Sequence, residues 1–165
     1  MSGLNRFDWE LFLAAMAFSH LAGVIGHAKP GKWYRDLKKS RLTPPNWVFG
    51  LMWFLLFTAR AVALFLIVQR NILTPLWQAS AWLWVVEWLL SIVWLVVFFR
   101  MRMLGWALAV LVVLLLVSAT VCGLFFSMFW PPGLLYVLVV LWELFALYLN
   151  IRVVWKNMPK EAAEF

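Results

Sequence analysis

Five long apolar runs constrain this chain more than any other feature of its sequence. A helix needs about 20 mostly apolar residues to cross the hydrocarbon core of a bilayer. Within that core every backbone N–H and C=O group must be paired inside the protein, which favours helices. The sequence therefore predicts an all-α fold, a bundle of five transmembrane helices that forms one domain over residues 1–165. The predicted spans are residues 8–27, 46–68, 77–99, 104–129 and 134–156.

The composition agrees with a membrane protein and argues against several other classes. Hydrophobic residues make up 66% of the 165 residues, whereas soluble domains contain roughly half. The sequence has no Walker loop, Gly-rich dinucleotide turn or cluster of zinc ligands. We therefore predict no metal site and no obligatory cofactor. Because the basic residues flank the apolar runs, we expect them to contact a lipid bilayer and not nucleic acid.

The distribution of basic residues predicts an orientation. Five spans place the two termini on opposite sides, and only Arg6 and Arg70 fall on the N-terminal side. Cytoplasmic loops carry an excess of Lys and Arg, so we expect the N-terminus outside and the C-terminus in the cytoplasm. The sequence leaves open which membrane holds the chain. The basic residues on the predicted cytoplasmic side are Lys29, Lys32, Arg35, Lys38, Lys39, Arg41, Arg100, Arg102, Arg152, Lys156 and Lys160.

The stretch SRLTPPNWVFG separates a basic loop from the second apolar run. Proline is tolerated in the first turn of a helix, where backbone N–H groups lack partners. We predict Thr43 as the N-cap, with Pro44 and Pro45 in the first turn and Trp47 at the membrane interface. The preceding loop, residues 28–45, suits either an interfacial amphipathic helix or a solvated segment. Its length also suits a lid on the cytoplasmic side.

Three charged residues, Arg60, Glu87 and Glu143, interrupt the predicted spans. At about 1.5 Å of rise per residue, all three lie roughly 13–15 Å from the outer ends of their helices. Charged side chains at this depth normally face the protein interior. One Arg and two Glu leave an excess negative charge, which requires a proton, a ligand or a protonated His20. A packing salt bridge and a ligand or proton site both remain open, with Glu143 favoured as the partner of Arg60 and Glu87 nearer the ligand.

Several motifs resemble those of one membrane family. They are KWYRDLKKSRLTPPNWVFG followed by Trp53, WLVVFFRMRMLGWAL, and LWELFALYLN. In this order they resemble the TspO/MBR family, the translocator or tryptophan-rich sensory proteins, over most of the chain. The chain departs from the family pattern at Ser91, where Asn is usual, at Val110, where Asp is common, and near Leu138 and Val139, where a Pro-Tyr pair is absent. The resemblance therefore indicates a divergent member.

The resemblance implies a five-helix bundle, often a homodimer, with a ligand pocket beneath the first loop. It implies porphyrins, haem-like tetrapyrroles and sterols as ligands. Positions four and seven residues apart share a helix face, and this spacing groups the charged residues with the motif positions. We predict a ligand site formed by Trp33, Tyr34, Trp47, Phe49, Trp53, Arg60, Glu87, Ser91, Trp94, Phe98, Glu143 and Asn150.

The leading hypothesis is an integral membrane receptor or translocator for flat hydrophobic ligands, with porphyrin or a haem-like tetrapyrrole first and sterols second. Aromatic faces stack on flat rings, and a basic loop attracts carboxylates. No nucleophile, base and orienting group occur together, so we predict no catalytic residues. Two alternatives remain: a proton-coupled carrier or membrane enzyme for a lipid or isoprenoid substrate, and a structural membrane subunit whose charges hold a partner.

Overall fold

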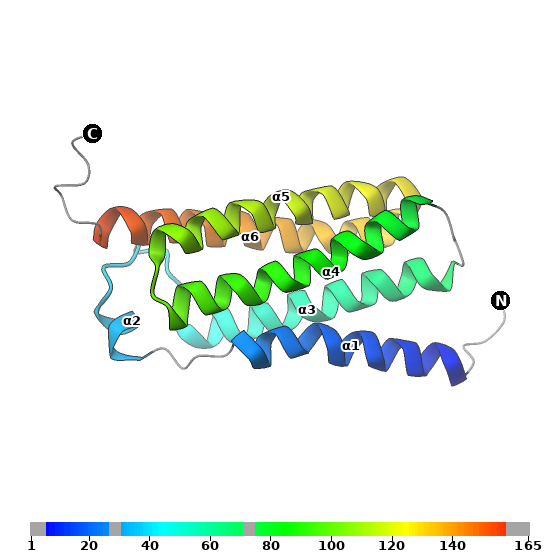
Figure 1. Ribbon diagram of the computed structural model, residues 1–165, viewed down its shortest axis with the longest axis horizontal. Coiled ribbons are helices and arrows are strands. Elements are labelled where there is room, and N and C mark those ends of the chain that lie inside the picture. The colour runs from blue at the N-terminus through cyan, green and yellow to red at the C-terminus, as the bar shows by residue number, and fades with distance from the viewer. Residues whose placement is uncertain (1–5, 27–30, 71–74, 158–165) are drawn as a thin grey trace.

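The computed structural model describes residues 6–26, 31–70 and 75–157, and all regular structure in these ranges is helical (Figure 1). This confirms the all-α prediction. The long helices run side by side along one axis, and the short helix α2 lies at the end of the bundle opposite the N-terminus (Figure 1). The elements are α1 (Arg6–Gly26), α2 (Lys32–Asp36), α3 (Asn46–Gln69), α4 (Pro75–Leu95), the π-helix η1 (Val96–Arg100), α5 (Leu104–Met128) and α6 (Trp130–Asn157).

Four of the long helices are long and apolar enough to cross a membrane: α3, α4 continued by η1, α5 and α6. In α1 the apolar stretch is shorter and covers Trp9–Val24. The chain is a multi-pass integral membrane protein, built as a helical bundle. The membrane crossing of α1, which the sequence predicts as the first of five spans, remains a prediction.

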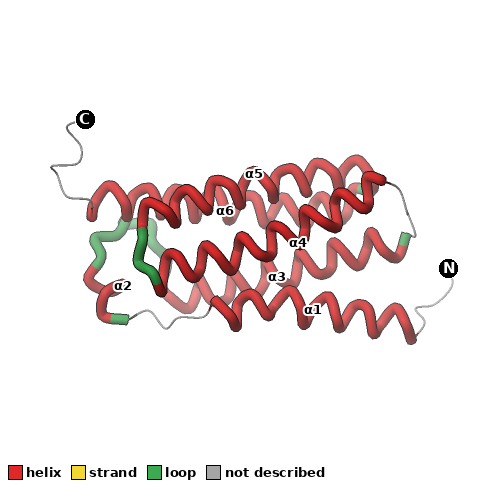
Figure 2. Tube along the Cα trace, viewed as in Figure 1, coloured by secondary structure: helices red, strands yellow, loops and turns green. Residues whose placement is uncertain are grey.

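The five long helices form a closed ring. Along this ring α1 packs on α3, α3 on α6, α6 on α5, α5 on α4, and α4 on α1. Figure 2 shows that α5 and α6 lie together on one side and α1 and α3 on the other, with α4 between them. Because every long helix has two neighbours, the ring encloses an interior that is shielded from lipid. That interior holds both the aromatic core and the buried charges.

Two glycines allow close packing at the two sides of the ring. A Cβ on Gly23 of α1 would lie 3.2 Å from the ring of Phe57 in α3. A Cβ on Gly133 of α6 would lie 2.5 Å from Cγ of Phe126 in α5, well inside van der Waals contact. Gly133 is therefore required for the approach of α6 to α5 just after the single residue that joins them, Phe129.

The proline pairs mark helix starts, but not as the sequence predicted. Helix α3 begins at Asn46, after Pro45, and has no side-chain cap hydrogen bond, so the prediction of Thr43 as N-cap is wrong. The first turn closes instead through the backbone, where Val48 N donates to Pro45 O at 2.9 Å. The second pair lies inside the first turn of α6, which starts at Trp130. Proline is compatible with that turn, so the helix begins four residues before the predicted 134–156 span.

Five tryptophans are at least 64% exposed: Trp47, Trp82, Trp106, Trp130 and Trp155. All except Trp82 lie within three residues of an end of a long helix. Tryptophan is enriched where membrane meets water, because its ring is apolar and its N–H needs a partner. The four terminal side chains therefore mark the two levels of the headgroups.

Candidate functional site

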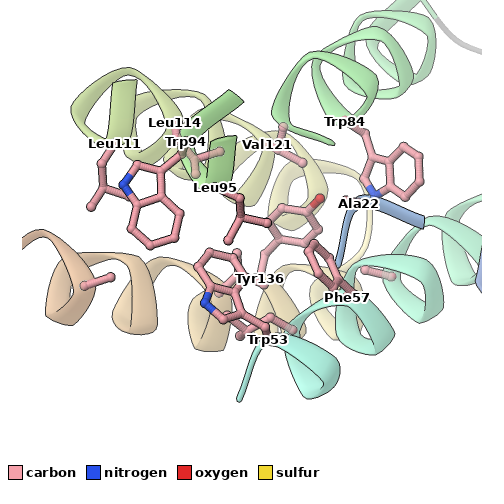
Figure 3. Close-up of a cluster of buried hydrophobic side chains, with 14 of the residues drawn as sticks. Ala22, Trp53, Phe57, Trp84, Trp94, Leu95, Leu111, Leu114, Val121 and Tyr136 are labelled. Atoms are coloured by element: carbon pink, nitrogen blue, oxygen red, sulfur yellow. The ribbon is translucent and has the colours of Figure 1, made fainter. Parts of the chain in front are cut away.

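A cavity of about 650 Å³ lies in the half of the ring that faces α2. Its walls come from α1, α3, the end of α4 with η1, α6 and the loop before α3. The central wall is aromatic: Trp53 lies 5.5 Å from Trp94 between ring centroids, and Trp94 lies 5.6 Å from Phe98. Figure 3 shows Trp53 and Phe57 on α3 and the indole of Trp94 among the surrounding core side chains. The rings offer flat apolar faces to a guest.

The π-helix η1 shapes one side of the cavity. Met101 N donates to Val96 O at 2.9 Å, the i to i+5 bond that widens the turn. Two consecutive residues, Phe98 and Phe99, both line the cavity as a result, with their centroids 4.7 Å apart. Short π-helices often occur at functional sites, since they change the direction of side chains within a helix.

The loop before α3 covers the mouth of the cavity with Tyr34, Lys39 and Thr43. Of the predicted loop 28–45, residues 28–30 lie outside the described residues. Tyr34 is buried, and its ring lies 6.2 Å from Phe98 and 5.6 Å from Phe99. Burial raises the pKa of the Tyr34 phenol above its ordinary value. Helix α2 therefore packs onto the bundle as an amphipathic cap.

Lys39 and Asn157 hold this loop in place. The three ammonium protons of Lys39 are directed at the carbonyls of Tyr34, Arg35 and Leu37, at 2.5, 3.2 and 3.2 Å. Partial burial lowers the pKa of the Lys39 ammonium, while nearby Asp36 opposes this shift. From the last turn of α6, the Asn157 amide pairs with both backbone groups of Lys38, each at 3.0 Å. The loop is thus tied to α6 by a two-point contact.

The cavity lining includes buried polar atoms that have no partner within the described parts of the chain. They are the hydroxyl of Thr43, the indole N–H of Trp94, and both amide atoms of Asn150. Asn150 is 2% exposed. Buried polar groups are normally hydrogen-bonded, so these four atoms lack the partners that such groups normally have, and protein atoms cover each of them.

Arg60, Glu87 and Glu143 meet at the centre of the ring. Arg60 Nη2 donates to Glu143 Oε1 at 2.5 Å. Arg60 Nε lies 2.8 Å from Glu87 Oε1, close enough for an ion pair although the N–H is not aligned for a hydrogen bond. The prediction that only one glutamate pairs with Arg60 is therefore wrong. The similar depth predicted for the three residues is confirmed by their contacts.

Three hydroxyl groups complete this charge cluster. Ser118 donates to Glu87 Oε1 at 3.0 Å, and Tyr136 donates to Glu87 Oε2 at 2.7 Å. Ser91 accepts a hydrogen bond from Arg60 Nη1 at 3.0 Å and donates to the Glu87 carbonyl at 2.9 Å. The cluster therefore links α3, α4, α5 and α6 through side chains alone.

The comparisons with known proteins settle the family. The model of the TspO/MBR family matches residues 11–156. The chain belongs to the TspO/MBR family. Among TspO/MBR relatives, protein CrtK of Rhodobacter capsulatus is 33% identical over 156 residues, which cover 93% of this chain and 94% of that protein. The tryptophan-rich sensory protein of Cereibacter sphaeroides is 33% identical over 160 residues, covering 94% and 98%.

This TspO/MBR protein brings half of the predicted ligand residues to the cavity wall: Tyr34, Phe49, Trp53, Trp94, Phe98 and Asn150. The other half lies elsewhere. Trp33 packs edge-on against Phe98 outside the lining, and Trp47 is 70% exposed. The remaining four predicted residues belong to the charge cluster and do not line the cavity: Arg60, Glu87, Ser91 and Glu143. Because Glu87 is not on the cavity wall, the expectation that it lies nearer the ligand loses its support. Binding roles for all twelve remain predictions.

Sequence reasoning missed several lining residues of this TspO/MBR protein. Phe57 lies one turn after Trp53, and Phe99 is the second Phe of the WxxxFF motif, so helical spacing and the motif offered a signal for both. No local pattern indicated Lys39, whose place depends on how the loop folds. Among the described residues, no group of three His, Cys, Asp or Glu side chains could hold a metal ion.

Proposed function

We propose that this TspO/MBR protein is a membrane receptor or translocator that binds a flat hydrophobic ligand in the cavity, with porphyrin or a haem-like tetrapyrrole first and a sterol second. The observation that carries this proposal is the aromatic wall formed by Trp53, Trp94 and Phe98 around about 650 Å³. Ligand pockets typically measure about 300–1,000 Å³ and combine apolar walls with a few polar groups. Stacking on indole rings favours a planar guest over a branched one.

The unpaired polar atoms support a ligand with a polar edge. Thr43, Trp94 and Asn150 reach the cavity from the loop, α4 and α6. A tetrapyrrole carries carboxylate groups at its rim and a planar ring, so it can satisfy donors at one edge while its faces stack. A sterol offers one hydroxyl and would leave more of these atoms unpaired.

We test this proposal with tryptophan replacements titrated with protoporphyrin by its visible absorbance. Stacking beyond burial is worth about 0.5–1.5 kcal/mol, so Trp53→Leu and Trp94→Leu each weaken binding roughly three- to tenfold. A matched control lies on the same helix as Trp94 but is exposed, Trp82 on α4. Its Leu variant keeps the wild-type affinity. Equal losses in cavity and control variants would place the ligand outside this cavity.

We further propose that α1 crosses the membrane and that the cavity faces the cytoplasm. The described basic residues at the α2 end of the bundle include Lys32, Arg35, Lys38, Arg100 and Arg152, which supports a cytoplasmic position under the positive-inside rule. Lys29 and Lys160, also counted from the sequence, lie outside the described residues. Homodimer formation stays a prediction of the family resemblance.

Orientation is testable by labelling a single cysteine. Replacing Cys122 with Ser and Arg41 with Cys leaves one thiol, placed in the loop that covers the cavity. A membrane-impermeant maleimide reacts with this thiol in inverted vesicles and not in intact cells or right-side-out vesicles. Labelling from outside would reverse the proposed orientation.

A second candidate function, a proton-coupled carrier, is favoured by the charge cluster in the bundle interior. Intramembrane ionisable residues commonly mark proton and ion pathways. In vesicles, a carrier drives porphyrin accumulation when a pH gradient is imposed, whereas a receptor only binds. Accumulation that is unaffected by collapse of the gradient would exclude the carrier.

A further inference from the structure

The charge cluster carries more negative than positive charge. Arg60 is 2% exposed, and Glu87 and Glu143 are each 0% exposed. Arginine stays charged inside proteins, so two ionised carboxylates would leave one uncompensated negative charge. An isolated buried charge is costly enough that the group changes its protonation state instead. One of the two carboxyl groups therefore holds a proton.

Within the described ranges, the groups around Glu143 supply no second cation. Arg60 faces it from α3, Glu87 from α4 and Tyr136 from its own helix, while α5 contributes the hydroxyl of Ser118 to the cluster. On α1, His20 is on the cavity wall, where its ring nitrogens lie against Met16 O at 2.9 Å and the Thr58 hydroxyl at 3.3 Å. The histidine is therefore engaged away from the cluster.

The hydrogen bonds identify which carboxyl holds the proton. Glu87 accepts hydroxyl hydrogen bonds on both oxygens and contacts Arg60 as well. Glu143 accepts a single hydrogen bond on Oε1, and its Oε2 is buried with no partner in the described chain. Donors stabilise the ionised form of a carboxyl. Glu87 is therefore the carboxylate, and Glu143 Oε2 carries the proton.

The cluster lies directly behind the floor of the cavity. Three of the four helices that contribute to it place a cavity residue one turn away: Phe57 before Arg60 on α3, Trp94 after Ser91 on α4, and Ala146 after Glu143 on α6. The Arg60 guanidinium also lies 5.6 Å from the centroid of the Phe57 ring. Figure 3 shows Phe57 and Tyr136 within the same cluster of buried side chains. A guest on the floor is thus one side chain away from the charges.

We propose that Glu143 is an exchangeable proton site, and that protonation of this site and occupation of the cavity favour each other. This coupling deepens the proposed ligand-binding function and rests on it. A hydrophobic guest lowers the dielectric against the cavity floor compared with water, which disfavours the negatively charged form of the cluster. By linkage, the proton then raises ligand affinity by the same factor as the ligand raises proton affinity.

The first experiment detects the proton without any ligand. Infrared spectra of the full chain in lipid at neutral pH show the C=O stretch of a protonated carboxyl that is shielded from water. The band disappears in Glu143→Gln. It also disappears in Glu87→Gln, because Arg60 and Glu143 then form a neutral pair. Loss of the band in both variants places the proton on this carboxyl pair, and the hydrogen bonds above assign it to Glu143. Absence of the band in the wild-type chain, or its persistence in either variant, would overturn the proton site.

The second experiment measures coupling with the dimethyl ester of protoporphyrin, which has no carboxylate of its own to titrate. Wild-type affinity falls as pH rises from 6 to 9, by up to about tenfold per pH unit where the cluster titrates. Glu143→Gln resembles the protonated carboxyl and binds with a high affinity that does not change with pH. His20→Gln is the control for the histidine on the cavity wall, and it keeps the wild-type slope.

The outcomes separate the two proposals. A wild-type affinity that is equal from pH 6 to 9, or a slope that is lost in His20→Gln and kept in Glu143→Gln, would overturn the coupling. If no porphyrin or ester binds at any pH, the proposed ligand class and the coupling to it are refuted. The infrared band still decides whether the proton site exists.

Discussion

Replacing Asn150 with Leu should make the ligand-free protein more stable, which is unusual for a buried polar residue of a helix. Both amide atoms of Asn150 are buried without a partner in the described chain. An unsatisfied buried polar group costs about 1–3 kcal/mol. Leucine has a similar size and no polar atoms, so the substitution removes this cost without opening a large cavity. We expect unfolding to become less favourable by about 1–3 kcal/mol.

A matched control is available on the same helix. The amide of Asn157 donates to Lys38 O and to Val153 O and accepts from Lys38 N. Asn157→Leu therefore removes these hydrogen bonds, each worth about 0.5–1.5 kcal/mol, and lowers stability. At about 2–4 °C per kcal/mol for a chain of this length, thermal unfolding in one detergent should separate the two variants by several degrees in opposite directions.

Asn150→Leu is expected to stabilise the ligand-free protein and at the same time to weaken ligand binding. If the amide binds the polar edge of a porphyrin, Asn150→Leu loses a hydrogen bond worth about 0.5–1.5 kcal/mol, and affinity falls roughly three- to tenfold. A melting temperature that falls as much in Asn150→Leu as in Asn157→Leu would show that Asn150 is satisfied, and would refute this reasoning. Increased stability together with unchanged affinity would support the conclusion that the Asn150 amide is unpaired, but would show that the amide does not bind the ligand.

Three further predictions concern packing, pH and the loop. Gly133→Ala forces a Cβ to within 2.5 Å of a phenyl ring and should cost about 1–3 kcal/mol in thermal unfolding, whereas Gly123→Ala, with nothing within 4 Å, should cost nothing. Burial raises the pKa of Tyr34 above the ordinary tyrosine pKa of 10.0, so the folded loop loses stability as the pH rises from 10.0 through the raised pKa. The part of the tyrosinate absorbance that Tyr34→Phe removes should therefore titrate above pH 10.0. Porphyrin should protect residues 31–45 from hydrogen exchange, and Asn157→Leu should weaken that protection; exchange that is unchanged on saturation would exclude a lid.

The helices were predictable because length and hydropathy decide them. The fourth predicted span, 104–129, differs from α5 (Leu104–Met128) by one residue. The predicted helix starts are wrong where a proline is compatible both with a break between helices and with the first turn of a helix. Pro131 and Pro132 are compatible both with a break and with the first turn of a helix, and the sequence does not state which one the chain adopts.

The site was only partly predictable, for a different physical reason. Depth along a helix follows from residue number, so the meeting of Arg60, Glu87 and Glu143 could be foreseen. Their neighbours depend on helix rotation and on side-chain direction, which the sequence does not give. The donation of the Ser118 and Tyr136 hydroxyl groups to Glu87 is one such contact that the sequence does not indicate. The π-turn in η1 has the same apolar composition as an α-helix and leaves no signal in hydropathy.

The exposed tryptophans also define a length that the surrounding lipid must match. Trp130 and Trp155 lie at opposite ends of α6 and are 64% and 80% exposed. These positions are 25 residues apart, so about 1.5 Å of rise per residue separates them by roughly 37 Å along the helix. This exceeds a hydrocarbon core of about 30 Å and falls short of the full bilayer of about 40–45 Å, so both rings reach the headgroups of an ordinary bilayer with the helix nearly upright. In a thinner bilayer α6, with the helices packed on it, must tilt to keep both rings at the headgroups, and the loop that Asn157 ties to α6 tilts with it. Membrane thickness thereby sets the angle at which the entrance of the cavity meets the bilayer surface.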